Sequence, residues 1–177
     1  MVEVLRFTTS AASAAALDEL RRLVWSAFGD RFSEADWEHG LGGEHVVVRD
    51  VDHLVAHAAI VPRRIYVADA CLRAGYVESV ATMTTRRGEG LATLAMTEAN
   101  AVIAGAFEIG VLSTSSQQFY DRIGWERWRG PTYVVTPGGR VRTEDEDAGI
   151  MVLRTGPSVT VDLTSAIACE ARDGDDW

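Results

Sequence analysis

A carboxylate in the middle of a strand-like run is the first residue of this sequence that could do chemistry. Glu78 lies within Gly75–Thr82, a run otherwise rich in residues that strands favour. Strands disfavour Glu, so a glutamate there points to a role beyond strand formation. A carboxyl group with a pKa of about 4.3 is a poor base for an ammonium group unless burial raises that pKa or water relays the proton. The alternative is a structural glutamate that bonds to a neighbouring side chain on the sheet.

A glycine-rich turn follows this run. Arg86 and Arg87 precede Gly88 and Gly90, and a strongly periodic helical pattern begins at Leu91. The first N–H groups of a helix lack partners and the helix dipole adds to their pull, so such a terminus attracts phosphate. The turn indicates a phosphate site, with a plain strand-to-helix turn as the alternative.

The charge of the chain limits its partners. It has 26 acidic and 17 basic residues and a formal net charge of −9. Nucleic acid and anionic membrane surfaces both need a basic face, so neither is an expected partner. A cationic small molecule suits this charge, although acidity can also serve solubility alone.

Cysteine and histidine spacings indicate no metal site. Cys71 and Cys169 form no close pair with each other or with histidine, and two buried thiols in a reducing cytoplasm are the expectation. His57 lies among apolar strand residues and is most simply a core histidine.

Residues 1–7 lack a basic region followed by an apolar run, so we expect no signal peptide, no membrane span and a cytoplasmic location.

Periodicity and capping residues predict the elements that position Glu78 and the glycine turn. The pattern predicts strands over 2–7, 44–48, 54–67, 71–83, 108–112, 131–136 and 150–153, with a further alternation over 159–163. It predicts helices from the cap Ser13 to near Gly29, from Ser33, over 91–105 and over 117–123. Pro62 suggests a bulge or a sheet edge. Residues 137–149 are expected to form a loop and 169–177 a tail, within one mixed α/β domain over residues 1–177.

Arg87-Gly-x-Gly-x-Ala92 after a glutamate-bearing strand resembles the pyrophosphate-binding turn of the GNAT (general N-acetyltransferase) superfamily, whose members bind acetyl-CoA. The predicted order of elements is similar as well. The resemblance implies a GNAT acetyltransferase fold of the α/β (α+β) class, with a mixed, mostly antiparallel central sheet flanked by helices. Its middle strands splay apart around the pantetheine arm. The implied cofactor contacts are Val80, Thr82, Arg87, Gly88, Gly90, Leu91 and Ala92.

Four stretches sharpen the resemblance to the aminoglycoside 2′-N-acetyltransferases. They are Asp36–Gly43, Gly75–Glu78, Leu112-Ser113 with Tyr120–Trp125, and Gly174–Trp177, in the family's order and at matching spacing. An aminoglycoside carries several ammonium groups, so its site needs several carboxylates. The resemblance implies substrate contacts at Asp30, Asp36, Glu78, Ser113, Asp147, Asp175 and the carboxylate of Trp177. Glu144, Glu146 and Asp173 are interpreted as solvated surface charges.

The resemblance also implies roles in catalysis. Glu78 would act as a base through water, and a backbone N–H near Val80 would hold the thioester oxygen. Tyr120 would donate a proton to the CoA thiolate, since a phenol has a pKa of about 10, near that of a thiol. Packing of a helix on the sheet is the alternative for Tyr120. No metal is required.

The chain departs from the family at four places. Ser79 follows Glu78 where the family usually keeps Gly, and a Cβ there would crowd the strand. Ala148 replaces an acid and Ala171 an aromatic residue, and Arg31 lies in an apparent one-residue insertion between Asp30 and Asp36. These changes bear on substrate identity, which leaves an aminocyclitol of the kasugamycin type open.

The expected function is direct, acetyl-CoA-dependent N-acetyl transfer in a ternary complex to an aminoglycoside amine, the 2′-amine on this resemblance, with antibiotic resistance as one role. A GNAT enzyme acting on a polyamine or another small amine is one alternative. A low-turnover module that binds acyl-CoA or an antibiotic is another. A homodimer would be consistent with the family.

Overall fold

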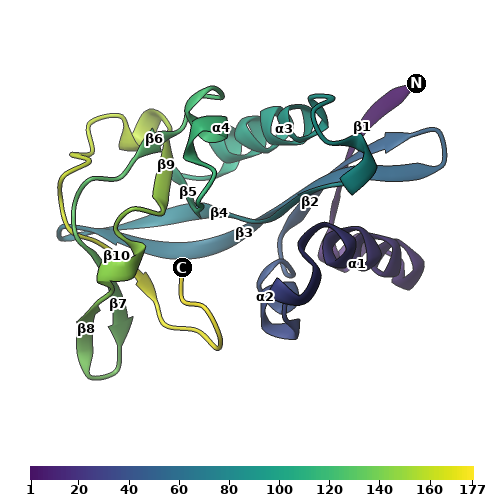
Figure 1. The fold of residues 1–177 in the computed structure, drawn as a ribbon. Coiled ribbons are helices and arrows are strands. Elements are labelled where there is room, and N and C mark those ends of the chain that lie inside the picture. The colour runs from purple at the N-terminus through teal and green to yellow at the C-terminus, as the bar shows by residue number, and fades with distance from the viewer. The chain divides into compact units, whose positions relative to one another are not determined.

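The computed structural model describes all of residues 1–177. Its strands are β1 Val2–Thr8, β2 Glu44–Asp50, β3 His53–Val67, β4 Ala70–Thr82, β5 Ile109–Ser113, β6 Glu126–Arg127, β7 Thr132–Thr136, β8 Gly139–Arg142, β9 Ile150–Arg154 and β10 Ile167–Glu170 (Figure 1). Its helices are α1 Ala14–Phe28, α2 Glu34–His39, α3 Leu91–Ala106 and α4 Gln117–Asp121. None of these helices combines the length and apolarity that a membrane crossing requires.

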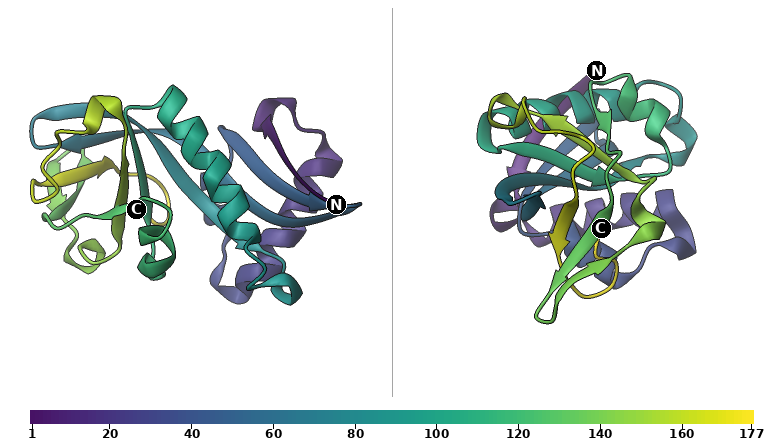
Figure 2. Two further views of the ribbon diagram at one scale, coloured as in Figure 1. Left: turned by 90° about the horizontal axis from the view of Figure 1, so that it is seen from above. Right: turned by 90° about the vertical axis from the view of Figure 1, so that its left-hand side faces the viewer.

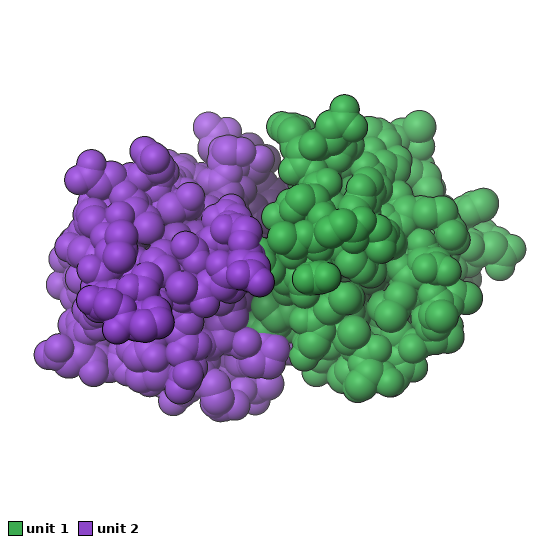
Figure 3. All heavy atoms as spheres, turned by 90° about the horizontal axis from the view of Figure 1, so that it is seen from below, with its two compact units in different colours: residues 1–61, 77–101 green, residues 62–76, 102–177 purple.

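The chain forms two compact units, each contributed by two segments (Figure 3). The first comprises residues 1–61 and 77–101, and the second comprises residues 62–76 and 102–177. Strands β3 and β4 and helix α3 each supply residues to both units. The expectation of one domain over residues 1–177 stays a prediction.

The first unit contains a small antiparallel sheet, helices α1 and α2, and the first part of α3. β1 pairs with β2, and β2 pairs with β3, so β1 is the edge strand that its alternating pattern predicted. Helices α1 and α2 lie together on one face of these strands (Figure 1). Their apolar side chains form one core with strand residues: Leu20, Leu23, Val24, Trp37, Val47, Leu54 and Ala81.

Capping residues set the ends of these two helices, as the sequence predicted. The Ser13 hydroxyl accepts a hydrogen bond from the Ala16 N–H at 3.2 Å, and Gly29, with a φ of 62°, ends α1. Ser33 and Asp36 form a reciprocal capping box at the start of α2. Each cap satisfies N–H groups that the helix itself leaves without acceptors.

The second unit contains most of the mixed sheet, whose strands follow the order β6-β9-β5-β4-β3-β10-β7-β8. β4 pairs with β5 in parallel from Ala74↔Ile109 to Tyr76↔Val111, and the pairing ends there although both strands continue. Pro62 lies between two pairings on one side of β3, because β2 pairs as far as Ile60 and β10 begins at Ile65. Proline lacks an N–H, so it fits such an unpaired edge position.

The sequence interpretation was wrong at several elements of the second unit. The expected loop 137–149 contains strand β8, which pairs with β7 as a hairpin from Tyr133↔Arg142 to Thr136↔Gly139. No strand forms over 159–163; instead the last strand is Ile167–Glu170, within and before the expected tail, and it pairs in parallel with β7. Figure 2 shows these three strands together from two sides. Smaller differences are the C-terminal ends of α3 and α4 and the two-residue strand β6, which was not predicted. Both cysteines were expected to be buried, but Cys71 is exposed and only Cys169 is buried.

A close backbone approach at Gly43 gives a test of this fold. A Cβ at Gly43 would lie 2.0 Å from the Ile60 carbonyl oxygen, so Gly43→Ala must move one of two paired strands. We expect Gly43→Ala to lower the free energy of unfolding by about 2 kcal/mol or more, as overpacking does. Urea denaturation measures this value.

Gly105→Ala is the matched control, because a Cβ there meets no atom within 4 Å. It replaces a glycine in the last turn of α3 and should raise the free energy of unfolding by about 0.5–1 kcal/mol. Equal effects of the two substitutions would contradict the packing described here.

Candidate active site

The glycine turn before α3 has the backbone that an anion site needs. Gly88 and Gly90 have φ values of 86° and 79°, which side chains other than glycine rarely adopt. The first intrahelical hydrogen bond runs from the Leu94 N–H to the Gly90 carbonyl at 3.1 Å, so the N–H groups of residues 91–93 precede the helical ladder. The first turn of α3 carries no acid.

The two arginines beside this turn differ in their partners. Arg86 donates to Glu89 at 2.8 Å and to Asp50 at 3.2 Å, so two carboxylates already balance its charge. Arg87 is exposed and donates to the Ala27 carbonyl at 2.9 Å, a neutral acceptor that leaves its positive charge in place. The turn therefore offers backbone N–H groups and the charge of Arg87 to an anion, with little contribution from Arg86. Binding of a pyrophosphate there stays a prediction.

A left-handed residue interrupts β4 between two predicted catalytic positions. Ser79 has a φ of 52°, and Glu78 and Val80 on either side of it are half-buried. A non-glycine residue in this conformation costs about 1–2 kcal/mol. The Ser79 hydroxyl lies beside Gly40, where an added Cβ would come within 3.2 Å of it. Crowding of the substrate by Ser79 stays a prediction. The conformation explains why glycine suits this position.

Asp30 and Asp36 lie at the entry to α2. Asp30 is exposed in the 3₁₀ turn Gly29–Arg31. One Asp36 oxygen accepts from the Ser33 N–H at 2.7 Å and from the Ser33 hydroxyl at 2.8 Å, so this carboxylate also has a structural role. Sequence reasoning missed Arg21, whose guanidinium lies 4.4 Å from the Trp25 ring centre and pairs with Glu34.

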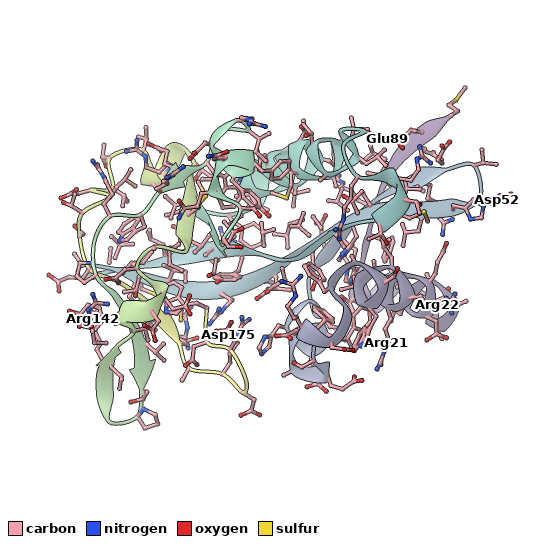
Figure 4. The ribbon with its side chains drawn as sticks, viewed as in Figure 1. Arg21, Arg22, Asp52, Glu89, Arg142 and Asp175 are labelled. Carbon is pink, nitrogen blue, oxygen red and sulfur yellow. The ribbon has the colours of Figure 1, made fainter.

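An open, acidic cavity lies in the second unit, with a volume of about 350 Å³. Five carboxylate side chains and one guanidinium line it. The lining residues are Arg142, Thr143, Glu144, Asp145, Glu146, Gly174, Asp175, Asp176 and Trp177. Figure 4 labels Arg142 at the end of β8 and Asp175 on the C-terminal segment. Two of the predicted substrate residues, Asp175 and Trp177, thus belong to one concave and negatively charged surface.

Glu146 was interpreted as a surface charge, and the structure gives it a different environment. It accepts a hydrogen bond from the Ser113 hydroxyl at 3.2 Å. Burial, together with the charge of Asp175, raises the pKa of the Glu146 carboxyl. The structure therefore joins the predicted residues Ser113 and Asp175 through an acid that sequence reasoning discounted. A run of four acids over 144–147 was the only signal, and it does not distinguish one member from another.

Asp147 is held by neighbouring residues instead. Its carboxylate accepts from the Arg142 guanidinium at 2.7 Å and from the Thr132 N–H and hydroxyl, both at 2.9 Å. The Arg142 hydrogen bonds, above all, lower the pKa of Asp147 to about 2. The Thr143 hydroxyl donates to Thr132 at 2.9 Å and accepts from the Trp177 indole at 3.2 Å, so this network reaches the cavity wall. Direct contact of Asp147 with substrate stays a prediction.

The C-terminal segment is ordered by its own hydrogen bonds. The Arg172 N–H donates to Asp176 at 2.9 Å, and the Trp177 N–H donates to Asp175 at 3.2 Å. The Trp177 ring is buried, with 3% of its surface exposed. Ala171, at a position where the family usually has an aromatic residue, is exposed, and its N–H donates to the Val135 carbonyl at 3.1 Å.

Tyr120 lies on α4 with 7% of its surface exposed. Its ring makes edge contacts with Phe119 and Trp125, at centroid distances of 4.9 and 6.0 Å. Burial raises the pKa of the Tyr120 phenol, so it carries its proton throughout the neutral range. The contacts agree with packing. The raised pKa keeps Tyr120 protonated and also makes it a weaker acid than an ordinary phenol, so its catalytic role stays a prediction.

Comparisons with known proteins identify the family of this chain. The model of an acetyltransferase (GNAT) domain matches residues 8–128. An aminoglycoside 2′-N-acetyltransferase from Mycolicibacterium fortuitum is 45% identical over 161 residues, which cover 89% of this chain and 83% of that protein.

Solved structures share the fold at low identity. The GNAT family N-acetyltransferase YhbS from Escherichia coli, in complex with CoA, superposes with a TM-score of 0.68 at 17% identity, over 98% of this chain and 95% of that one. A probable N-acyltransferase from Enterococcus faecalis superposes with a TM-score of 0.61 at 19% identity over 72% of this chain. This chain spans only 33% of the length of that protein.

The Asp147 ion pair predicts a specific acid sensitivity. Its folded pKa of about 2 lies below the ordinary 3.8, so the ionised carboxylate stabilises the fold above about pH 4. That contribution is lost as the pH falls from about 4 towards 2. The difference in unfolding free energy between wild type and Asp147→Asn should therefore be largest near neutral pH and shrink over this acid range.

Urea denaturation at a series of pH values measures this difference. Asp69→Asn, at the exposed turn between β3 and β4, removes the same charge without this network and serves as the control. A wild-type advantage over Asp147→Asn that is constant down to pH 2 would contradict the assigned ion pair.

Proposed function

Because this chain belongs to the GNAT acetyltransferases and, within them, to the aminoglycoside 2′-N-acetyltransferases, we propose that it acetylates an amine of an aminoglycoside or a related aminocyclitol antibiotic. The 45% identity over 161 residues to an enzyme of that name carries the proposal. The 2′-amine is the proposed acceptor and acetyl-CoA the proposed donor. The acidic cavity supports a polycationic substrate on independent physical grounds.

Acetyl-CoA supplies an activated acetyl thioester, and the glycine turn before α3 fits its pyrophosphate. Gly88 and Gly90 keep side chains away from the α3 N-terminus, and exposed Arg87 adds a positive charge. Val80, Thr82, Leu91 and Ala92 are the remaining proposed contacts of the cofactor.

The chain's own residues supply the proton transfers in this proposal. Glu78, half-buried in β4, accepts the ammonium proton through water and so produces a neutral amine. The Val80 N–H donates to the carbonyl oxygen on which negative charge develops. Tyr120 enters the reaction protonated and donates to the departing sulfur, and the apolar surroundings that raise its pKa also disfavour a thiolate. Direct transfer of this kind needs no covalent enzyme intermediate.

The acids of the cavity provide the proposed recognition of ammonium groups. Asp175 and Glu146 with its partner Ser113 are the strongest candidates, beside the Trp177 carboxylate. We place Asp147 second, since Arg142 already balances its charge. Asp30 and Asp36 are kept as contacts from the first unit. A homodimer, a cytoplasmic location and a role in antibiotic resistance stay predictions.

Release of CoA thiol in the presence of different amines tests the proposal. We expect release with gentamicin and tobramycin and none with kanamycin A, which has a hydroxyl at the 2′ carbon. Glu78→Gln should lower turnover about 100-fold or more, the usual effect of losing a general base. Spectrophotometric detection of free CoA thiol measures both the acceptor preference and the turnover of Glu78→Gln.

Other outcomes identify other functions. Release with kasugamycin alone would keep the chemistry and change the acceptor. Release with spermidine alone would reject the antibiotic substrate in favour of a polyamine. Binding of acetyl-CoA without release for any amine in this panel would favour a binding module.

Glu146 provides a separate test of recognition. Glu146→Gln keeps the shape of the side chain and removes its charge, so the KM for the aminoglycoside should rise about tenfold, as expected for one charge-assisted hydrogen bond. The KM for acetyl-CoA should stay close to the wild-type value. Asp69→Asn controls for net charge, and steady-state kinetics at fixed ionic strength compares the three proteins. An unchanged aminoglycoside KM in Glu146→Gln would remove Glu146 from the substrate site.

A further inference from the structure

Two buried histidines in the first unit have no part in the proposed chemistry. His45 on β2 and His57 on β3 are each 1% exposed. The Nδ1 of His45 lies 3.1 Å from the Nε2 of His57. Burial of two imidazoles in a core needs partners for all four nitrogens, so each nitrogen has to be accounted for.

The partners determine the direction of every hydrogen bond. The Ser79 carbonyl, 2.9 Å from His57 Nδ1, can only accept, so this nitrogen carries the hydrogen. The Nε2 of neutral His57 must then accept from His45 Nδ1, and the Nε2 of His45 accepts from the Thr9 hydroxyl at 2.8 Å. The Thr9 oxygen in turn accepts from the Gly42 N–H at 2.9 Å. A chain of hydrogen bonds therefore runs from Gly42 to Ser79. It branches only at Thr9, whose hydroxyl also lies 3.3 Å from the Gly43 carbonyl, a longer contact than the 2.8 Å to His45.

This series of hydrogen bonds is compatible only with neutral imidazoles. A second proton on His57 would point one N–H at another, because His45 Nδ1 already donates there. Burial lowers the pKa of His45 to about 4 and, with the neighbouring His45, that of His57 to about 3. Both rings stay neutral and both tautomers stay fixed in the neutral range.

The series of hydrogen bonds ends at Ser79, the one strained residue of the proposed catalytic segment. Ser79 has a φ of 52° and lies between Glu78 and Val80. Its carbonyl is fixed by His57, and its hydroxyl lies against Gly40, in the turn that also contains Gly42. The strained peptide is thus held at its carbonyl by His57, and Gly40 of the same unit leaves room for its side chain.

We infer that His57, supported by His45 and Thr9, is a positioning residue that holds the Ser79 peptide and thereby sets Glu78 and the Val80 N–H for acetyl transfer. The catalytic half of this inference rests on the proposed function, whereas the structural half concerns only the backbone of β4. A histidine pair that merely fills the core would have no preferred effect on Ser79.

A double-mutant cycle of His57→Leu with Ser79→Gly tests the inference. Glycine adopts a positive φ without strain, so it needs no group to hold its carbonyl. In the Ser79 background, His57→Leu should lower kcat about tenfold, the loss expected for one hydrogen bond, with the KM for acetyl-CoA nearly unchanged. In the Ser79→Gly background the same substitution should lower kcat by about threefold at most. An equal loss in both backgrounds would show that His57 only packs the core.

Two milder variants keep the test decisive if His57→Leu does not fold. His57→Asn places an amide donor near the former Nδ1 and should retain more kcat than His57→Leu. Thr9→Val removes the first hydroxyl of the chain and keeps the side-chain shape, so it should lower kcat in the same sense, whereas His53→Asn, an exposed histidine, should not. Loss of kcat in His53→Asn, or none in Thr9→Val, would overturn the role of the chain.

The same cycle measured by urea denaturation needs no substrate. Coupling between His57 and Ser79 in the free energy of unfolding would support the structural half of the inference, and strict additivity would overturn it. A wild-type protein without turnover on any amine would overturn the proposed function and the catalytic half together. The unfolding cycle would still decide whether His57 holds Ser79.

Discussion

The left-handed peptide at Ser79 is the constraint on which the first unit depends. A strand residue with a φ of 52° is unfavourable for any side chain, and it persists only where neighbours hold it. Close packing at two glycines and one hydrogen bond surround the Ser79 peptide. Gly40 leaves room for the Ser79 hydroxyl, and the absence of a side chain at Gly43 lets its backbone lie against the Ile60 carbonyl. A neutral hydrogen-bond chain through two histidines then fixes the carbonyl of the strained residue.

Electrostatics dominates the second unit. Its cavity is lined by carboxylates from the 144–146 turn and from the C-terminal segment. Ionised carboxylates this close repel one another, so a nearby cation must balance them or the pKa of some must rise. Arg142 satisfies Asp147, and the pKa of that acid falls. Glu146 accepts from the Ser113 hydroxyl, but burial and the charges of Asp175 and Asp145 raise its pKa. An ammonium group from a substrate would relieve the repulsion, which links the substrate class to the shape of this surface.

Sequence patterns predicted the elements whose stability is local. Helix α1 follows from apolar spacing, the Ser13 cap and Gly29, all within one continuous segment. The short strands β8 and β10 escaped prediction because each is stabilised by pairing with β7 rather than by its own pattern. Residues 159–163 alternate as a strand would, yet no strand forms there. Alternation shows that a segment can pair, and only the tertiary structure supplies a partner.

The sequence by itself determined the family, the glycine turn before α3 and the acidic run 144–147, because residue types and spacings carry that information directly. It could not rank neighbouring acids in the run 144–147, since partners distant in sequence decide which one is neutralised. Arg142 and Thr132 fold onto Asp147, while Ser113 meets Glu146 from another strand. The tertiary structure alone also revealed the left-handed Ser79 and the histidine chain behind it, because a backbone angle and a tautomer depend on contacts that no linear pattern encodes.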